Sequence, residues 1–308
     1  MTETPTDAAF DIRSLPFPEA LRWLRENGEP AETRPDVDTA SLRRRFPRLA
    51  GVSISELVVE TPNGPQPARV YVDETARLSG RALVWVHGGA FIGGHLDMPE
   101  SNWVALELAA HGIPVLAVDY TKCLGDVHFP VPSDDVLAGW RYARERSAEL
   151  FGVQPDSLLL GGASAGGTLT AGAVARLRDA GEDVPAGLVS VYPAAHPDGG
   201  RPGEIPDPAS PTTQISLNYA GTAEKLADPH VFAGLGSGAG FPPTLIVVCE
   251  LDGLRPSGEA FASLLADAGV DASLHVEPGA DHAHINEPSD PTALPTIEAI
   301  ATWIGARA

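Results

Sequence analysis

The sequence is poor in the residues that build disulfide frameworks, and it has no long apolar run. Its 308 residues include two cysteines, Cys123 and Cys249, which form no CxxC pair. We therefore expect neither a disulfide-stapled fold nor a cysteine-based metal site. No segment approaches the ~18 consecutive apolar residues of a membrane-spanning helix, and the segment 1–10 is polar in character. A cytoplasmic protein without stable membrane association is the expectation.

Positive charge is scarce as well. Lys and Arg number 21 against 41 Asp and Glu, which gives a net charge of -20 at pH 7. Such a protein repels phosphate backbones and anionic membranes, so nucleic acid is not an expected partner. We interpret the short basic run Arg43, Arg44 and Arg45 as the exposed face of a helix. Hydrophobic residues still make up 43% of the chain, which is enough for a large core.

Short apolar segments recur along the chain and alternate with amphipathic stretches. Continuous apolar runs separated by helical patterns are typical of parallel strands with helices on both faces of the sheet. A hairpin of segments 54–60 and 68–72, around Asn63 and Gly64, precedes them, and we expect it to have a slightly long loop. The fold class is therefore α/β with a mostly parallel central sheet, whose strands are expected at 82–87, 114–119, 157–160, 188–192, 244–249 and 273–276.

Helical periodicity predicts the elements between the strands. One helix is expected to begin at Asp134 with Ser133 as its N-cap and to continue to Leu150, with Gly152 beyond its end. Two regions do not follow this alternation: residues 1–49, with two short helical segments, and the Pro/Gly-rich stretch 194–240. Long irregular segments in a compact domain are often functional lids. We predict that both regions contribute to a cap over a catalytic domain of residues 50–308.

A G-x-S-x-G pattern stands at residues 162–166, between an expected strand and an expected helix. In this context the pattern is typical of a nucleophile elbow. The sharp turn strains the serine backbone, so a side chain at either glycine would collide with the strand or the helix. The competing interpretation is a glycine-rich helix start for packing or phosphate binding, but no accompanying phosphate-binding motif supports it. Ser164 is therefore the candidate nucleophile.

The segment 87–91, with the sequence His-Gly-Gly-Ala-Phe, follows directly after another expected strand. Acyl transfer builds negative charge on a carbonyl oxygen, and preorganised backbone N–H groups stabilise that charge. We predict an oxyanion hole formed by the N–H groups of Gly88, Gly89 and Ala165. The alternative is a plain glycine turn in a flexible loop, since Gly93 and Gly94 follow.

A serine hydroxyl needs a base that takes its proton and an acid that fixes the tautomer of the base. Asp252 stands just past the end of an expected strand, whereas Asp281 is adjacent to His282 and cannot easily orient it; Glu250 is a minor alternative. Both His282 and His284 follow the last expected strand, and either can reach the site. A metal site built on these histidines lacks an HExxH or CxxC partner, so no metal is expected.

Taken together, these motifs resemble those of the hormone-sensitive-lipase-like family of microbial carboxylesterases over nearly the whole chain. The resemblance implies an α/β-hydrolase fold without a cofactor, with His282 rather than His284 as the catalytic histidine, Asp252 as its acid and His87 as a supporting residue. It also implies that the cap consists of the N-terminal helices and an insertion at about 194–232. The matching segments are 87–91, 119–120, 129–130, 134–135, 162–167, 242–252 and 279–282.

Three positions depart from the family pattern. Ala163 stands where an acidic residue is usual, and His284 stands where an aromatic residue is usual, which suggests a more polar edge of the site. The segment 119–125, Asp-Tyr-Thr-Lys-Cys-Leu-Gly, lacks the arginine and the glutamate of the family. Their joint absence suggests that a supporting polar network has been replaced.

The function predicted from these residues is a serine carboxylesterase that hydrolyses small or short-acyl esters through an acyl-enzyme. Two alternatives stay open: an amidase or deacetylase of a small metabolite, and a non-catalytic protein that binds a small molecule. The expected partner is a small-molecule ester, and a homodimer is a further option.

Overall fold

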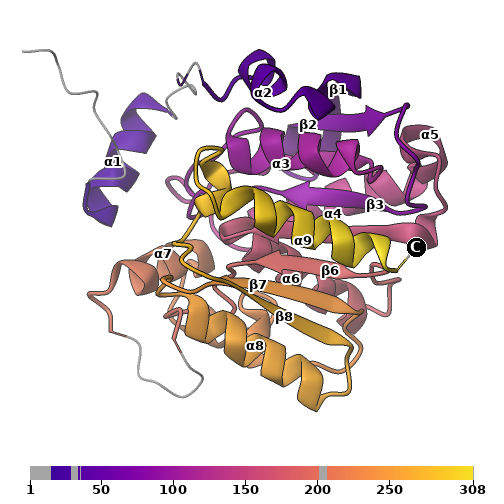
Figure 1. Cartoon of the computed structure of the whole chain (residues 1–308). Helices are drawn as coiled ribbons and strands as arrows, with labels where there is room; N and C mark the ends of the chain where they lie inside the picture. Colours follow the sequence, from indigo (N-terminus) through magenta and orange to yellow (C-terminus); the bar gives the residue numbers. More distant parts are fainter. Residues whose placement is uncertain (1–14, 29–33, 35, 201–206, 308) are drawn as a thin grey trace, which may run out of the picture.

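An eight-stranded sheet forms the centre of the molecule, within the described residues 15–28, 34, 36–200 and 207–307 of the computed structural model (Figure 1). Its order is β1-β2-β4-β3-β5-β6-β7-β8. Strand β2 runs antiparallel to both of its neighbours, β1 and β4, while all other neighbouring pairs are parallel. The predicted mostly parallel α/β fold is confirmed. The strands are β1 (Val52–Thr61), β2 (Gly64–Asp73), β3 (Ala82–Val86), β4 (Val115–Val118), β5 (Leu158–Ala163), β6 (Leu188–Val191), β7 (Thr244–Cys249) and β8 (Ala272–Glu277).

Helices cover both faces of this sheet. Side chains of α3 and α9 pack in a core with Leu83 and Trp85 of β3, while side chains of α4, α6 and α8 pack in a second core with Val84 and Val86. Strands buried on both faces need apolar residues at every position, which explains their uninterrupted runs. The helices are α1 (Phe17–Asn27), α2 (Thr39–Arg45), α3 (Pro99–Ala110), α4 (Val131–Glu145), α5 (Ser147–Phe151), α6 (Ala165–Asp179), α7 (Pro211–Ala220), α8 (Arg255–Asp267) and α9 (Ala293–Gly305).

The hairpin of β1 and β2 is tighter than the sequence suggested. Thr61 lies opposite Gly64, so only two residues connect the strands. Side-chain hydrogen bonds stabilise this short turn. The Thr61 hydroxyl contacts the carbonyl of Gly64 and the carboxylate of Asp135 on α4. The side-chain amide of Asn63 donates to the same carboxylate. The expected slightly long loop is therefore wrong.

The predicted start of the helix after β4 is also wrong. Helix α4 begins at Val131, behind Pro130, and Ser133 lies inside it instead of capping it. The Ser133 hydroxyl accepts a hydrogen bond from Arg176 at 2.7 Å, which removes it from any capping role. The expected single helix to Leu150 is split into α4 and α5, and Gly152 ends the second with a left-handed φ of 68°.

The strand order brings two chemically important loops together. β3 and β5 are neighbours in the sheet, whereas β4 lies on the other side of β3, so the chain direction across the sheet reverses between them. In open α/β sheets, ligands bind beyond the carboxyl ends of the strands at such a point. The loop after β3 carries the His-Gly-Gly segment, and the turn after β5 carries Ser164.

The two regions expected to form a cap behave differently. α1 packs against α7 of the insertion, and both lie on the same side of the molecule in Figure 1. By contrast, α2 packs against α3, and its Leu42 belongs to the core shared by α3 and α9. These contacts favour α1 and the segment 194–232 as the cap and α2 as part of the body, and the cap stays a proposal; residues 1–14, 29–33, 35 and 201–206 lie outside the described residues.

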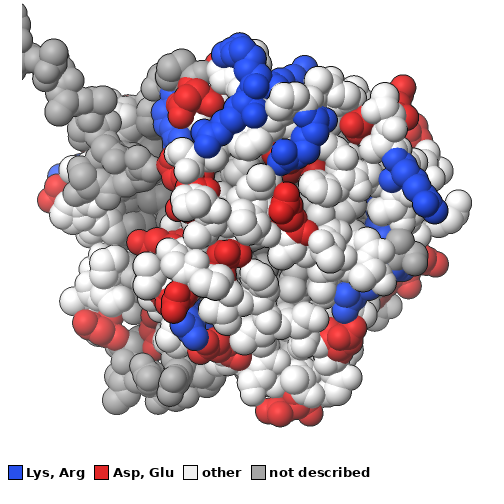
Figure 2. All heavy atoms as spheres, in the orientation of Figure 1, with Lys and Arg blue, Asp and Glu red and all other residues white. Residues whose placement is uncertain are grey.

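The surface shows how the charges are distributed. In Figure 2, blue Lys and Arg atoms gather near the top of the face, where Figure 1 places α2, and red Asp and Glu atoms are spread across it. Arg44 and Arg45 of α2 are exposed, as expected for the face of a helix, while Arg43 reaches back to the carbonyl of Val52. Across the described part of the chain, no helix has the length and apolar character that a membrane crossing requires.

Candidate active site

Ser164 occupies a strained turn between β5 and α6. Its φ of 53° and ψ of -119° lie in a region that residues with a side chain rarely adopt. A Cβ added at Gly162 would lie 2.5 Å from the backbone carbon of Gly166, and one added at Gly166 would lie 2.1 Å from the carbonyl oxygen of Val86. The turn therefore requires both glycines, for the steric reason that the sequence indicated.

The structure brings Ser164, His282 and Asp252 together from three loops. The Ser164 Oγ lies 2.9 Å from Nε2 of His282, and Nδ1 of the same ring lies 2.7 Å from Oδ2 of Asp252. A carboxylate accepts hydrogen bonds, so these partners assign the ring proton to Nδ1 and leave Nε2 to accept the serine proton. Asp252 is buried and His282 is part-exposed. This is the geometry of an activated serine hydroxyl.

The alternative acids hydrogen-bond elsewhere. Asp281 accepts the backbone N–H of His282 at 2.7 Å and does not orient its ring. Glu250 accepts the backbone N–H of Gly279 at 2.7 Å and so connects the aspartate loop to the histidine loop. Asp252 is thus the carboxylate in contact with the imidazole.

His284 lies behind the site rather than at its edge. It is 2% exposed, and its ring hydrogen-bonds to the thiol of Cys249 at 3.3 Å and to the hydroxyl of Thr296 at 2.8 Å. Burial lowers its pKa below the ordinary value, which keeps the ring neutral. The expectation that His284 gives the site a more polar edge is therefore wrong, because its polar atoms face a second buried network.

The electrostatic surroundings of His282 favour its protonated form. Burial by itself lowers the pKa of His282, but the hydrogen bond and the charge of Asp252 outweigh burial, and Glu100 and Asp281 add to their effect. The resulting pKa lies above the ordinary value of 6.5. An imidazole that takes the serine proton is thus stabilised as an imidazolium.

The hydrogen bonds of the segment 87–91 show that Gly88 does not have the role predicted for it in the oxyanion hole. The N–H of Gly88 donates to Oε1 of the buried Glu100 at 2.6 Å, so it is not available to an oxyanion. The carbonyl of Gly88 accepts Nδ1–H of His87 at 2.7 Å and the hydroxyl of Tyr120 at 3.0 Å. Because the C=O and N–H of a trans peptide point in opposite directions, these bonds turn the N–H of Gly89 away from His87 and Tyr120.

Several backbone N–H groups of the loop after β3 and of the first turn of α6 have no acceptor among the described residues. The N–H groups of Gly89, Ala90 and Ala165 donate to no acceptor within the described part of the chain. Gly89 has a φ of 113°, and a Cβ there would lie 2.0 Å from the carbonyl oxygen of Gly93, so no other residue fits. The arrangement retains Gly89 and Ala165 as oxyanion-hole candidates and replaces Gly88 by Ala90.

A charged network supports this loop from behind. Nε2 of His87 lies 3.0 Å from Asp119, and the ammonium group of Lys122 hydrogen-bonds to the same carboxylate and lies 3.9 Å from the ring centre of Tyr120. Burial alone would raise the pKa of Asp119, but the His87 hydrogen bond and the Lys122 charge hold it below its usual range. Lys122 thus supplies a positive charge in the loop that lacks the family's arginine, in agreement with the hypothesis of a replaced network.

Glu100 and Tyr192 were not identified from the sequence. Glu100 stands in the first turn of α3, where an acidic residue is ordinary because of the helix dipole. Tyr192 is the last residue of an expected strand, and its residue type by itself indicates no role in a site. Only the burial of the Glu100 carboxylate distinguishes it from a surface residue. The burial of one side chain cannot be predicted from the neighbouring residues in the sequence.

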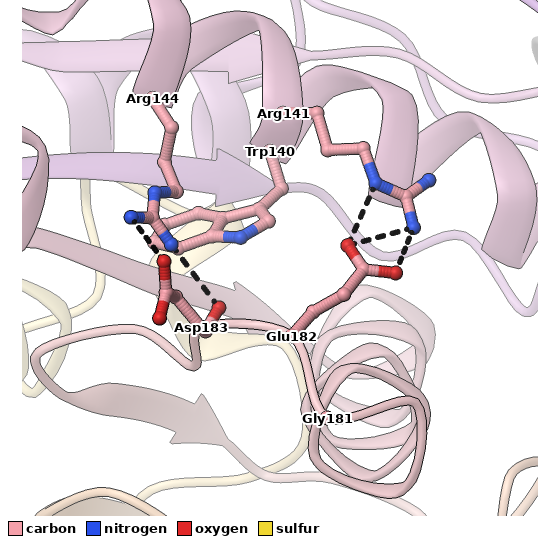
Figure 3. Close-up of a pocket in the computed structure, with 6 residues that line it drawn as sticks. All are labelled: Trp140, Arg141, Arg144, Gly181, Glu182 and Asp183. Atoms are coloured by element: carbon pink, nitrogen blue, oxygen red, sulfur yellow. Dashed lines mark hydrogen bonds and ion pairs between the residues drawn. The ribbon is translucent and has the colours of Figure 1, made fainter.

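A surface hollow of about 310 Å³ lies at the far end of α6 from Ser164. Figure 3 shows its two guanidinium groups, Arg141 and Arg144 on α4, pointing toward Glu182 and Asp183. The N–O distances are 2.8 and 2.9 Å. Because these charges neutralise one another, the hollow offers no unpaired cation to an anionic ligand.

Comparisons with known proteins agree on one family. A family profile described as alpha/beta hydrolase fold matches residues 83–286. The chain is similar to an ethyl acetate hydrolase from Pseudomonas putida, with 32% identity over 80% of this chain and 82% of that protein. It is 28% identical to an acetyl-hydrolase from Streptomyces hygroscopicus, over 92% of each protein. The structure of a Pyrobaculum calidifontis esterase superposes with a TM-score of 0.74 at 24% identity, covering 96% of this chain and 94% of that one.

Proposed function

Because the chain belongs to the hormone-sensitive-lipase-like carboxylesterase family of α/β-hydrolases, we propose that it hydrolyses small carboxylic esters through an acyl-enzyme on Ser164. The single observation that carries the proposal is the pair of contacts from Ser164 to His282 and from His282 to Asp252, at 2.9 and 2.7 Å. The names of the relatives support a small ester as the substrate.

In the first half of the reaction, Ser164 Oγ attacks the ester carbonyl carbon while its proton passes to Nε2 of His282. The tetrahedral intermediate then collapses, the bond to the alcohol oxygen breaks, and His282 returns the proton to that oxygen. The products of this half are a free alcohol and a serine ester of the acyl group. Asp252 holds the ring in the required tautomer and stabilises its positive charge.

In the second half, a water molecule attacks the acyl carbonyl, and His282 takes one of its protons. When this intermediate collapses, the proton returns to Ser164 Oγ and the carboxylic acid leaves. Negative charge develops on the carbonyl oxygen in both halves. The N–H groups of Gly89, Ala90 and Ala165 are the proposed donors to that oxygen, because their hydrogen-bonding capacity is unused among the described residues.

The cap is proposed to bound the acyl or alcohol group of the substrate. It comprises α1 and the segment 194–232, and its helix α7 contacts the oxyanion loop directly. The ring of Tyr219 at the end of α7 stacks on the ring of Phe91, with centroids 4.1 Å apart. A movement of α7 would therefore displace the loop that carries Gly89 and Ala90.

The test is hydrolysis of p-nitrophenyl esters from acetate to laurate, measured beside acetanilides. We expect turnover of the shorter esters, and a loss of at least about 1,000-fold in the Ser164→Ala variant. Labelling with a fluorophosphonate, followed by mass spectrometry of the modified peptide, should identify Ser164. The Ser53→Ala variant, which changes an exposed serine on β1, is the control and should keep its activity. Turnover that survives in Ser164→Ala would refute the assignment, and faster acetanilide than ester hydrolysis would favour the amidase alternative.

A further inference from the structure

A buried carboxylate that the proposed reaction does not use lies next to the site. Glu100 is 1% exposed, and every one of its polar atoms has a partner. Its Oε1 accepts the N–H of Gly88 at 2.6 Å and its Oε2 accepts the hydroxyl of Tyr192 at 2.6 Å. Its backbone N–H donates to Asn286 and its carbonyl accepts the indole N–H of Trp85. Within the described residues no Lys or Arg forms an ion pair with it, so neutral donors alone compensate its burial.

The two donors to Glu100 belong to the two halves of the site. Gly88 lies in the oxyanion loop, directly before Gly89. Tyr192 follows β6, and its ring lies edge-on to the imidazole of His282, with centroids 4.9 Å apart. Tyr192 has an unfavourable φ of 36°, so its place beside the imidazole needs support from outside its own backbone.

The hydroxyl of Tyr192 is a permanent donor to this carboxylate. Burial raises the pKa of Tyr192 well above its ordinary value, and the charge of Glu100 raises it further. The tyrosine is therefore neutral at every pH at which the protein works, and its O–H bond points at Oε2. Glu100 thus acts as a fixed bridge between the oxyanion loop and the ring beside the base.

We propose that Glu100 is a positioning residue for ester hydrolysis: its carboxylate locks the Gly88 peptide and, through Tyr192, the ring that packs against His282. The proposal rests on the proposed function. Acceptance of the Gly88 N–H keeps the His87–Gly88 peptide from rotating, while the bonds from His87 and Tyr120 to the Gly88 carbonyl orient the following peptide, which carries the N–H of Gly89. Acceptance of the Tyr192 hydroxyl holds the imidazole against sideways movement, so that Nε2 stays in line with the serine oxygen.

The charge of Glu100 has a separate and measurable consequence. Three carboxylates raise the pKa of His282, those of Asp252, Glu100 and Asp281, and the charge of His282 in turn lowers the pKa of its basic neighbour His284. Removal of one anion destabilises the imidazolium, so the pKa of His282 falls and the acid limb of the activity profile moves to lower pH. A purely structural role in the fold would leave that limb in place.

The experiment compares two variants of the bridge with a control on the same helix. Glu100→Gln keeps the shape of the side chain and removes the charge, and Tyr192→Phe removes one donor while it keeps the ring. The control is Glu107→Gln. Glu107 is also a buried carboxylate of α3, with hydrogen bonds from Trp103 and Arg48 at 2.8 Å each, but it lies away from the site.

In Glu100→Gln we expect kcat to fall by about 10-fold to 100-fold, less than the loss of an oxyanion donor itself, with KM changed by less than about 2-fold. The acid limb should move to lower pH. Tyr192→Phe should lower kcat by a smaller factor, with no move of the limb beyond that of the control. In the double variant the losses should be smaller than the product of the single losses, because both changes break the same bridge. Glu107→Gln should lower only the melting temperature.

The proposal is overturned if Glu100→Gln, folded by circular dichroism, matches Glu107→Gln in both kcat and pH profile. If Glu100→Gln does not fold, Tyr192→Phe decides alone, and an unchanged kcat in that variant overturns the bridge. These outcomes leave the proposed function intact as long as the unaltered protein hydrolyses esters and Ser164→Ala does not. An unaltered protein without Ser164-dependent turnover would refute both proposals together.

Discussion

At the scale of single residues, the site depends on which atoms already have partners. Asp252 differs from Asp281 because it reaches the imidazole, whereas Asp281 is bonded to the backbone of His282. Gly88 differs from Gly89 because Glu100 occupies its N–H. In each pair the residue types are the same, and the hydrogen-bond partners decide which member is able to act.

The pH dependence of the reaction follows from His282. The base is active only when neutral, and its pKa lies above 6.5, so activity should fall as the pH drops through a midpoint above that value. The measurement is kcat/KM for p-nitrophenyl acetate across the neutral range. In Asp252→Asn the midpoint should fall, and the rate should drop by roughly 10,000-fold because the tautomer is lost. A flat profile down to about pH 5 would contradict the assignment of the base.

At the scale of elements, the sheet positions the loops and the cap contacts them through aromatic rings. Phe91 in the oxyanion loop stacks on Tyr219 of α7, which also packs edge-on against Phe129 and Phe232. The hydroxyl of Tyr219 is buried and has no hydrogen-bond partner among the residues described. An unpaired buried hydroxyl lowers the stability of the folded protein relative to a phenyl ring at the same position.

Tyr219→Phe should therefore increase the free energy of unfolding by about 0 to 2 kcal/mol, because it removes an unpaired polar atom and keeps the ring stacking. The melting temperature measures this. The matched control is Tyr71→Phe, in which an equally buried hydroxyl donates to Asn102 at 3.0 Å. That variant should lose about 1 kcal/mol. A clear loss of stability in Tyr219→Phe would show that its hydroxyl has a partner in the folded protein.

At the scale of the whole molecule, the chain carries a net charge of -20 at pH 7. Figure 2 shows acidic side chains spread over the face, with one group of basic side chains near α2 and others at the right edge and lower on the face. Such a field lowers the local concentration of anions and has little effect on neutral molecules. The cytoplasmic location and the homodimer stay predictions at this scale.

An anionic ester, such as a p-nitrophenyl half-ester of a dicarboxylic acid, should react more slowly than a neutral ester of the same length. Added salt screens the repulsion, with a Debye length of about 10 Å at 0.1 M. We therefore expect kcat/KM of the anionic ester to rise severalfold between low and high salt, while that of the neutral ester stays nearly constant. Equal salt responses of the two substrates would show that the net charge of the protein does not change the electrostatic potential at the site.

The sequence by itself determined the order of the strands and pointed to Ser164, Asp252 and one of two histidines, and the family resemblance selected His282 over His284. Buried parallel strands need unbroken apolar runs, and a strained elbow needs glycines on both sides of Ser164, so these features are visible in local patterns. Even so, the start of α4 was misplaced, because whether Ser133 caps a helix depends on Arg176, which is 43 residues away.

Tertiary structure alone decided which backbone donors are left without an acceptor and what supports the loop that carries them. The bond between Glu100 and Tyr192 joins residues 92 positions apart, and the ring of His284 faces Cys249, 35 positions away, instead of the site. The roles of Gly88, Ala90 and Lys122 depend on such pairings in the same way. The cost of burying a polar atom depends on which partner reaches it in the folded chain, and no local pattern of residues contains that information.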